Sequence, residues 1–390
     1  MKTVGIICEY NPFHTGHLHQ INLAKKDGDT AVICLMSGNA TQRGEFALTD
    51  KFTRAAAALS SGADLVLELP FPYSASSADY FASAGVTLLD SLGVDEINFG
   101  SESADAEALR AAAEVTSSAE FASAYEKKLE DHPALGTARA YFDTLADLGL
   151  GGCISPNDIL GISYFRAAYR SDCDAKLTVI RREGDGYNSS VSSGKSHPSA
   201  TAIRASLKKG DSSALSLMPP SAAKILEGAH LTDPERISSA VLSFFRLADG
   251  EELSRFAEAG GGLSHRLCTA AQKATSLEEF YTEAASKRYT DARVRRATLN
   301  CLIGVTHDDL RTPPAYLQLL AANSAGRKIL AGLKKSSALP IVTKPADAPE
   351  CRQTELSRRL DALFTLAFSP SKSSAEYIKA TPFIDFSEKD

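Results

Sequence analysis

Residues Gly5 to His17 read GIICEYNPFHTGH and carry the clearest structural pattern in the sequence. It begins inside a short apolar run at residues 3–8 and then turns polar. Pro12 stiffens the polar part, and Gly16 allows the backbone to approach a ligand. This pattern predicts a buried strand over residues 3–8, then a loop, then a helix that begins near His17.

The same alternation continues along the first half of the chain. Short apolar runs rich in Val, Ile and Leu recur at residues 30–36, 64–69, 96–99 and 176–183. Helical patterns separate them at residues 51–61, 76–92, 107–148 and 199–209, with a further helix that starts at Ser155-Pro156. Strands and helices in alternation imply a parallel sheet with helices on both faces. We therefore predict an α/β fold with a Rossmann-like parallel sheet.

The pattern changes after Gly210-Asp211-Ser212. Beyond that point the sequence shows helical patterns almost only, with one short apolar run at residues 338–342 as the exception. A polar loop at residues 184–198 precedes the change. We therefore expect a sheet domain over residues 1–212 and a mainly helical domain over residues 213–390.

The composition excludes several classes of protein. The chain has 390 residues, 44% of them hydrophobic and 23% charged, which is typical of a globular protein. Its formal net charge of −6 argues against a surface that binds polyanions everywhere, although a local basic face stays possible. No run of about 18 apolar residues exists, so no membrane partner is expected. None of the seven cysteines forms a C-x-x-C pair, which favours reduced thiols and a cytoplasmic location over a zinc knuckle.

His14 and His17 lie three residues apart at the expected start of a helix. Both imidazoles can therefore point the same way, beside the free N–H groups and the positive end of the helix dipole. Such a site suits a polyphosphate, because the rings can donate hydrogen bonds to charge that develops when pyrophosphate leaves. A metal pair is an alternative, but no third ligand stands at zinc-like spacing. Two surface histidines are the other alternative.

The H-x-G-H arrangement resembles the signature of the nucleotidyltransferase superfamily that includes class I aminoacyl-tRNA synthetases. The run PSATAIR at residues 198–204 resembles the superfamily's late motif, which holds a triphosphate. By that resemblance, Ser199, Thr201 and Arg204 would grip phosphate oxygens. Ser199 is also expected to cap its helix, and capping does not exclude a contact with phosphate.

A closer resemblance covers most of the chain. The sequence is similar to the bacterial tRNA(Met) cytidine acetate ligases in the stretch at residues 5–17 and in a series of later motifs. These motifs are QRGE from Gln42, DKFTRAAAAL from Asp50, GADLVLELPF from Gly62, INFGSE from Ile97, SPNDILG from Ser155, SATAIR from Ser199 and SKRYTDARVRR from Ser286. The resemblance implies a HIGH-type nucleotidyltransferase domain followed by a domain that binds tRNA.

The resemblance also implies a reaction. ATP and acetate would form acetyl-adenylate and pyrophosphate, and the acetyl group would pass to N4 of the wobble cytidine of elongator tRNA(Met). His14 and His17 would be catalytic. The ATP site would comprise Ile7, Cys8, Glu9, Tyr10, Asn11, Pro12, Phe13, His14, Thr15, Gly16, His17, Leu18, His19, Gln20, Gly100, Asn157, Arg182, Ser199, Thr201 and Arg204. Mg²⁺ usually accompanies ATP, but no acidic cluster marks a dedicated metal site.

A polar cluster follows the second expected strand and comprises Gln42, Arg43, Asp50, Lys51 and Arg54. It could line an acetate pocket or the path of the tRNA. Alternatively, Asp50 only caps a helix, and Lys51 and Arg54 form a solvated face. The chain departs from the family pattern at Phe52, where a tryptophan is expected, and at residues 38–41, which read GNAT in place of GDFV.

Basic residues gather near the start of another expected helix. The tRNA-binding candidates are Lys287, Arg288, Arg293, Arg295 and Arg296, with Tyr289 among them as a ring that could stack on a base. The alternative is a solvated helix face with Glu283 and Asp291 as counter-charges. Arg327 and Lys328 are further candidates, but their spacing does not place them on the same face.

Two rival functions share parts of this pattern. An adenylyltransferase or cytidylyltransferase for a small phosphate ester would share the H-x-G-H motif without an RNA partner. A non-catalytic RNA-binding protein with a decayed nucleotide site is the second rival. The intact motif residues argue against decay; they are His14, Gly16, His17, Ser199, Thr201 and Arg204.

Overall fold

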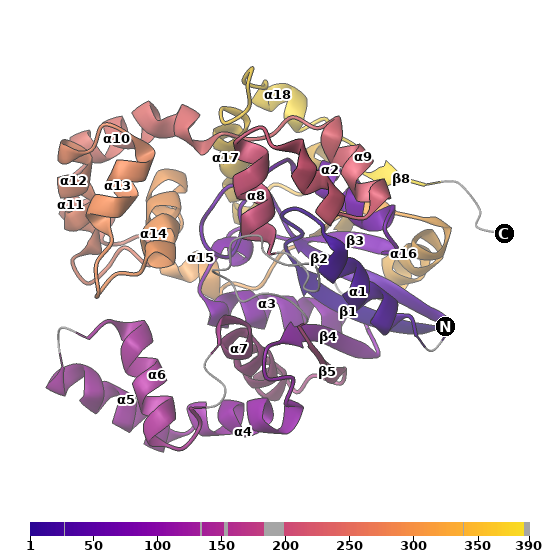
Figure 1. Ribbon diagram of the computed structural model, residues 1–390, viewed down its shortest axis with the longest axis horizontal. Coiled ribbons are helices and arrows are strands. Elements are labelled where there is room, and N and C mark those ends of the chain that lie inside the picture. The colour runs from indigo at the N-terminus through magenta and orange to yellow at the C-terminus, as the bar shows by residue number, and fades with distance from the viewer. Residues whose placement is uncertain (27, 133–134, 152–154, 183–198, 338, 386–390) are drawn as a thin grey trace.

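A central parallel sheet organises the molecule (Figure 1). The computed structural model describes residues 1–26, 28–132, 135–151, 155–182, 199–337 and 339–385. The five strands that the sequence predicts are all present and run parallel in the order β5-β4-β1-β2-β3. They are β1 (Lys2–Cys8), β2 (Thr30–Ser37), β3 (Leu65–Leu69), β4 (Glu96–Ser101) and β5 (Lys176–Arg181). The fold class predicted from the sequence is thus confirmed.

The strand order reverses direction at β1. The chain adds β2 and β3 on one side of β1 and then crosses over to add β4 and β5 on the other side. Val4 on β1 pairs with Val32 on β2 and with Glu96 on β4. In open α/β sheets, ligands bind at the carboxyl ends of the strands where the order reverses. The carboxyl ends of β1 and β4 therefore define the expected crevice.

Helices cover both faces of the sheet. One core holds Ile33, Leu67 and Phe99 against α3 (Ala78–Ser91), α4 (Ala106–Thr116), α7 (Pro156–Ser171) and α16 (Ser324–Ser336). The opposite core holds Val32 and Cys34 against α1 (Thr15–Ala24), α2 (Lys51–Leu59) and α9 (Pro220–Glu227). The strands are apolar on both sides because both faces are buried.

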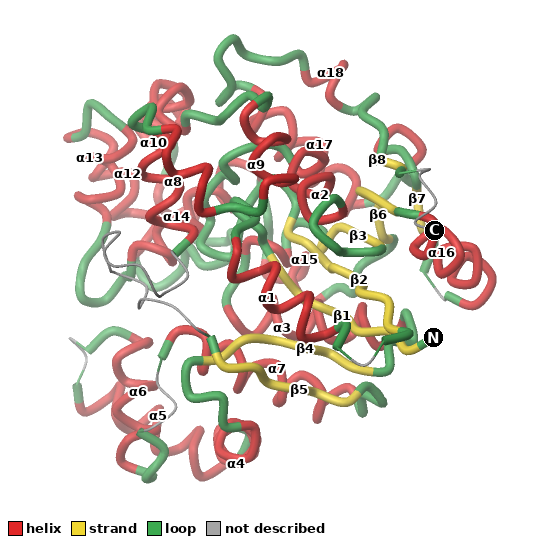
Figure 2. The backbone as a smooth tube through the Cα atoms, turned by 45° about the vertical axis from the view of Figure 1, so that its right-hand side comes forward, coloured by secondary structure: helices red, strands yellow, loops and turns green. Residues whose placement is uncertain are grey.

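The long helical stretch expected at residues 107–148 is divided into three helices. After α4 come α5 (Ala119–Asp131) and α6 (Thr137–Asp147). Ser118 caps α5 by accepting a hydrogen bond from the backbone N–H of Phe121, and Gly136 precedes α6. The expectation that this stretch is mostly helical is therefore confirmed, and Ser118 and Gly136 mark the breaks between its helices. Both views show the α5–α6 hairpin standing out from the sheet (Figures 1 and 2).

A compact helical unit has a core of its own. It contains α10 (Ser238–Leu247), α11 (Gly250–Leu253), α12 (Leu263–Lys273), α13 (Leu277–Ala284), α14 (Asp291–Ile303) and α15 (His307–Arg311). Phe245, Leu267, Phe280 and Val294 are buried together inside it. A smaller cluster joins Leu299 of α14 to Ala40 and Phe71 beside the sheet, so apolar packing attaches the unit to the sheet.

The sheet also takes strands from beyond residue 212. β6 (Leu317–Ala322) pairs antiparallel with β3, and β7 (Ile341–Val342) and β8 (Phe383–Ile384) pair with β6. The expectation of helical patterns almost only was wrong here, because periodicity cannot distinguish a short buried strand such as LQLLAA from a buried helix. The boundary at residue 212 stays a prediction.

The remaining elements connect these layers. They are α8 (Ala200–Lys208), α17 (Arg352–Thr365), α18 (Ser374–Tyr377) and the 3₁₀ turns Tyr73–Ala75, Ser212–Leu217, Pro234–Ile237 and Pro345–Asp347. The expected loop at 184–198 and the end of the expected strand at Glu183 lie outside the described residues, as does Ala338. Within the described part of the chain, no helix combines the length and apolar character needed to cross a membrane.

Candidate active site

The turn after β1 brings the two motif histidines together. His14 is the N-cap of α1, and its Nδ1 accepts a hydrogen bond of 3.1 Å from the backbone N–H of Gly16. The backbone N–H of His14 in turn donates to Nδ1 of His17 at 3.2 Å. This reciprocal capping starts the helix at Thr15, two residues before the predicted start near His17, because the His14 side chain serves as the cap.

The same hydrogen bonds set the protonation of the two rings. Because each Nδ1 accepts from a backbone N–H, the proton of each neutral ring is on Nε2, which can donate. The ring centroids lie 3.7 Å apart in a stacked arrangement. Burial, together with the nearby His14 and Arg182, holds the pKa of His17 well below 6.5. His17 is therefore a neutral hydrogen-bond donor at neutral pH.

A second wall of the crevice comes from β4, β5 and the start of α7. A Cβ on Gly100 would lie 2.9 Å from Cγ of Arg182, so glycine leaves the space that the arginine occupies. Asn157 Nδ2 donates to Glu102 Oε1 at 2.5 Å, and Arg182 Nε lies 4.0 Å from the same oxygen. Gly100, Asn157 and Arg182, which the sequence suggests separately, are thus brought together.

Glu102 is a residue to which the sequence assigned no role. Its carboxylate also accepts from Ser155 Oγ at 2.6 Å, so it joins the ends of β4 and β5 to the N-terminus of α7. The signal in the sequence was its position directly after the strand β4. An acidic residue does not suggest a phosphate site. The partners of Glu102, Asn157 and Arg182, also lie far from it in the sequence.

The third wall is the N-terminal turn of α8. Ser199 caps this helix by accepting from the backbone N–H of Ala202, as predicted. Arg204 Nη1 donates to the carbonyl oxygen of Asn11 at 2.7 Å, and its Nη2 donates to Thr201 Oγ1 at 3.2 Å. The late motif therefore contacts the H-x-G-H loop directly, although nearly two hundred residues separate them. Pro198 lies outside the described residues.

The other candidates in the loop and in α1 fall into two groups. The side chains of Ile7, Tyr10, Asn11, Pro12, Phe13 and His14 are buried, while Cys8, Glu9, Thr15, Gly16, His17, Leu18, His19 and Gln20 are half-buried. Tyr10 and Phe13 are each 1% exposed, so only their backbone can reach a ligand. Gln20 Nε2 donates to the side chain and the backbone oxygen of Asn98, which fixes α1 against β4.

Comparison with known proteins agrees with this geometry. A family model described as HIGH Nucleotidyl Transferase matches residues 1–378. The chain belongs to the HIGH nucleotidyl transferase family. The tRNA(Met) cytidine acetate ligase of Acetivibrio thermocellus is 35% identical over 93% of this chain and 92% of its own length. The enzyme of the same name from Clostridium perfringens is 32% identical over 97% of this chain and 98% of its own.

Two solved structures extend the match to the whole fold. Thermotoga maritima TmcAL in an apo form superimposes with a TM-score of 0.91 at 28% identity, covering 99% of this chain and 100% of that one. The same protein bound with alpha-thio ATP superimposes with a TM-score of 0.87 at 27% identity, covering 98% and 99%. The resemblance to the tRNA(Met) cytidine acetate ligases that the sequence suggested is thus confirmed.

In this HIGH nucleotidyl transferase, part of the predicted polar cluster is structural. Lys51 is 2% exposed, and its Nζ donates to both carboxylate oxygens of Glu68 at 2.8 and 3.0 Å. Its position between Glu68 and Asp361 raises the pKa of Lys51 despite burial, so the ammonium stays charged. Asp50 caps α2. Lys51 is therefore an internal, ion-paired group, which contradicts a solvated helix face at this position. Its part in an acetate pocket or a tRNA path stays a prediction.

Arg54 and Gln42 are also held by internal hydrogen bonds. The buried guanidinium of Arg54 donates to the carbonyl oxygens of Glu9, Ser37 and Gly38 at the ends of β1 and β2. Gln42 donates its backbone N–H to Glu9 and its side chain to the carbonyl oxygen of Ser76. Arg54 therefore shapes the loop after β1 and does not reach solvent, while Arg43 is half-buried.

The basic cluster at residues 287–296 is less uniform than the sequence suggested. Arg296 is 9% exposed and donates from Nε and Nη2 to the two carboxylate oxygens of Glu258, each at 2.7 Å. Arg296 therefore forms an internal ion pair with Glu258, and the prediction that Arg296 contacts a phosphate was wrong. Tyr289 is 7% exposed and donates to the carbonyl oxygen of Gly261, so its ring is not available to stack on a base.

The other four basic candidates keep some access to solvent. Lys287 and Arg288 are exposed, whereas Arg293 and Arg295 are half-buried. Arg293 donates to the carbonyl oxygens of Glu258 and Gly260. Arg327 and Lys328 are exposed on α16, which packs on β3, β2 and β6 far from α14 (Figures 1 and 2). These two residues therefore do not extend the cluster.

No metal centre is formed by the part of the chain that the structure describes. Within those ranges, no group of three or more His, Cys, Asp and Glu side chains is arranged to hold an ion. The predicted histidine pair instead receives backbone N–H groups at both Nδ1 atoms, and these atoms are thereby occupied.

Proposed function

We propose that this chain is an ATP-dependent tRNA(Met) cytidine acetate ligase. The curated relatives that span nearly the whole chain carry that name, and a structural neighbour binds an ATP analogue. The observation that carries the proposal is the convergence of His14, His17, Arg182 and Arg204 at the carboxyl ends of β1 and β4. Four groups that donate hydrogen bonds at a topological switch point suit a nucleoside triphosphate.

In the first step, a carboxylate oxygen of acetate attacks the α-phosphorus of ATP. The new P–O bond forms as the bond to pyrophosphate breaks, which gives acetyl-adenylate. His17 and His14 would donate from Nε2 to the oxygens that gain charge in the transition state. The N–H groups at the start of α1 and the side chains of Arg204, Ser199 and Thr201 would hold the phosphates.

The nucleoside end of ATP would lie along the second wall. Gly100 would allow the base or ribose to approach β4, Asn157 would hydrogen-bond to it, and Arg182 would face the phosphates. The remaining residues of the loop and of α1, from Ile7 to Gln20, would contribute through backbone groups and half-buried side chains. Mg²⁺ would enter with the triphosphate, whose oxygens are its ligands.

In the second step, the N4 amine of the wobble cytidine attacks the acetyl carbonyl carbon. The C–N bond forms, AMP leaves with the oxygen that joined it to the acetyl group, and the amine loses one proton. We propose that Lys287, Arg288, Arg293 and Arg295 contact phosphates of elongator tRNA(Met) on the helical unit. Arg288 and Arg293 line a hollow against Leu129 and Leu135 of the α5–α6 hairpin, which would border the bound RNA. A tRNA substrate implies a cytoplasmic enzyme.

One experiment tests the proposal and its rivals together. The purified protein is incubated with labelled acetate, ATP and total tRNA, and the RNA is then digested to nucleosides. We expect label in N4-acetylcytidine from tRNA(Met). If instead the protein transfers a nucleotidyl group to a small phosphate ester and leaves tRNA unlabelled, it is a small-molecule transferase. If it binds tRNA but consumes no ATP, it is an RNA-binding protein.

A further inference from the structure

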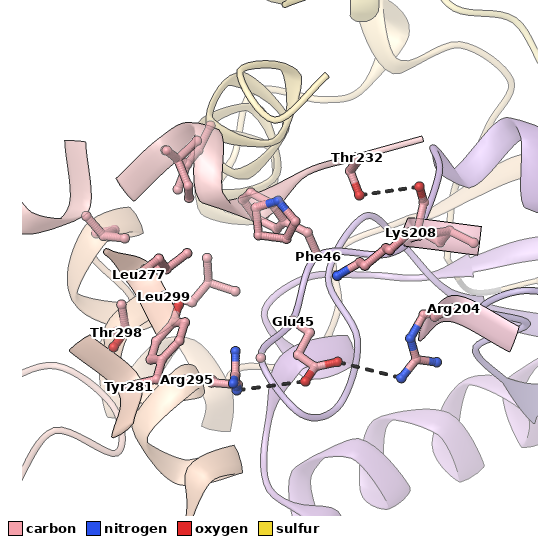
Figure 3. A pocket seen from close by; sticks show the side chains of 16 residues that line it. Glu45, Phe46, Arg204, Lys208, Thr232, Leu277, Tyr281, Arg295, Thr298 and Leu299 are labelled. Atoms are coloured by element: carbon pink, nitrogen blue, oxygen red, sulfur yellow. Dashed lines mark hydrogen bonds and ion pairs between the residues drawn. The ribbon is translucent and has the colours of Figure 1, made fainter. Parts of the chain in front are cut away.

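A cavity of about 200 Å³ lies between α8, the loop at residues 44–48 and the helical unit (Figure 3). One end of its lining is charged and contains Glu45, Arg204, Lys208 and Arg295. The other end is apolar. It is formed by aromatic rings and aliphatic side chains from the loop, the helical unit and α17, among them Phe46, Leu299 and Leu363. Sites for drug-sized ligands usually measure about 300–1,000 Å³, so this cavity suits a single heterocyclic base.

Glu45 is the acceptor at the charged end. Its carboxylate oxygens lie 3.8 Å from Arg204 Nη2 and 3.8 Å from Arg295 Nε, and its side chain is 32% exposed. Within the described ranges, no hydrogen-bond donor reaches this carboxylate. The carboxylate is thus oriented by two guanidinium groups and keeps its acceptor sites for a ligand.

The backbone fixes Glu45 in this place. Gly44 has φ of +76°, and a Cβ there would lie 2.5 Å from the backbone nitrogen of Arg296. Only glycine permits the loop to lie so close to α14. The loop therefore holds Glu45 beside Arg295, whose Nε is bonded to Asp291 at 2.7 Å while its two terminal nitrogens make no hydrogen bond within the described residues.

We propose that this cavity binds the base of the target nucleotide and that Glu45 and Arg295 distinguish cytosine from uracil. This inference rests on the proposed function. Cytosine offers the N4 amine as donor and N3 and O2 as acceptors. A carboxylate accepts from N4. A guanidinium donates to N3 or O2, and single-stranded bases are read on this edge. Uracil would turn its O4 oxygen towards Glu45 and would present an N–H at N3, so the contacts at both positions that differ between the two bases would be lost.

The cavity adjoins the site of acetyl-adenylate formation. Arg204 forms part of the lining and also donates to the carbonyl oxygen of Asn11 in the H-x-G-H loop. Leu48, another lining residue, donates its backbone N–H to Asn11 Oδ1 at 2.7 Å. A base seated here would bring its amine next to the activated acetyl group, and the half-buried ring of Phe46 and the leucines would receive its faces.

Glu45→Gln tests the proposal, because the amide can accept from cytosine and can also donate to O4 of uracil. We measure acetylation of a tRNA(Met) transcript and its inhibition by the same transcript with uridine at the wobble position. The preference for cytidine should fall by about 10-fold or more, since a base-specific contact contributes roughly 1–3 kcal/mol. Acetate-dependent pyrophosphate exchange without tRNA should persist.

Asp291→Asn is the matched control, because it removes a carboxylate from Arg295 outside the cavity. It should keep the preference for cytidine. Glu45→Asp, which retains the charge, should keep the preference and lower kcat/KM, and it serves if Glu45→Gln does not fold. An unchanged preference in Glu45→Gln, or an equal loss of pyrophosphate exchange, would overturn the inference. Failure of the wild type to acetylate tRNA would instead overturn the proposed function.

Discussion

The loop between β1 and α1 and the basic run at residues 287–296 use their polar groups in opposite ways. In the loop, backbone N–H groups occupy Nδ1 of His14 and His17, which leaves Nε2 of each ring as the donor. In the basic run, Glu258 takes up the guanidinium of Arg296, and carbonyl oxygens take up that of Arg293. In the loop the backbone fixes which ring nitrogen donates, whereas in the run several donors are bonded to internal acceptors.

The two patterns specify different amounts of structure. The H-x-G-H loop is defined by spacing at the end of a buried strand, so geometry and chemistry are specified together. The basic run is defined by charge alone, and α14 buries one side of it. Charge in a sequence indicates where cations gather but not which of them face solvent. Four predictions test the comparison.

The largest effect is expected for stability when Arg296 is replaced. Arg296→Met leaves the Glu258 carboxylate, whose side chain is 14% exposed, without its partner. Breaking such a pair typically costs about 3–5 kcal/mol, so the free energy of unfolding in urea should fall by about that much. The double variant with Glu258→Gln should recover part of the loss. A change below about 1 kcal/mol would mean that the pair behaves as a surface ion pair.

The next effect concerns catalysis by the loop. His17→Ala should lower kcat for acetyl-adenylate formation by about 10²–10³, because one donor to the developing charge is lost. The KM for ATP should change little, since the contact strengthens only in the transition state. Steady-state pyrophosphate exchange measures both constants. His265→Ala on the exposed face of α12 is the control, and a raised KM with unchanged kcat would assign His17 to ground-state binding.

The lowered pKa of His17 also implies that the stability of the protein depends on pH. Its folded-state pKa is held well below 6.5, so the unfolded chain binds more protons at this site between the two values. Stability therefore rises with pH in that window and is lost as pH falls below 6.5, by at most about 1.4 kcal/mol per pH unit. The thermal midpoint of the wild type should fall more steeply from pH 6.5 downward than that of His17→Ala. Parallel curves would contradict a buried neutral imidazole.

The smallest effect is expected at the exposed end of the basic run. Reversing charge at Lys287 and Arg288 should weaken tRNA binding and reduce its salt dependence by up to about 0.9 in slope for each lost phosphate contact. Pyrophosphate exchange without tRNA should be unchanged. Reversal at Arg327 and Lys328 on the distant α16 is the matched control. If the salt dependence of tRNA binding falls equally in both double variants, it reflects the overall charge of the protein and not a binding site at Lys287 and Arg288.

Much of the sheet could be predicted from the sequence, and less of what surrounds it. The strands near residues 3–8 and 30–36 are short, mostly apolar runs that contain Val and Ile, which is typical of strands buried on both faces. β6 was missed because a short run with five apolar residues out of six fits a helix as well as a strand. Its place in the sheet depends on pairing with β3, from which about 250 residues separate it in sequence.

The same limit applies to the site. His14, His17, Ser199 and Arg204 belong to motifs whose spacing carries the chemistry, and the structure brings them together. Glu102 and Glu45 have no spacing that marks them, because their partners Asn157, Arg182 and Arg295 come from other elements. Burial of Lys51 was equally invisible, since the carboxylates that compensate its charge stand on β3 and α17.

The most direct test of the account is pyrophosphate exchange in the absence of tRNA. The purified protein is mixed with ATP, labelled pyrophosphate and increasing acetate, and label in ATP is followed with time. We predict exchange that saturates with acetate, disappears without it, and is accompanied by AMP once tRNA(Met) is added. Exchange that ignores acetate, or the appearance of ADP and phosphate, would contradict activation of a small acid at the H-x-G-H site.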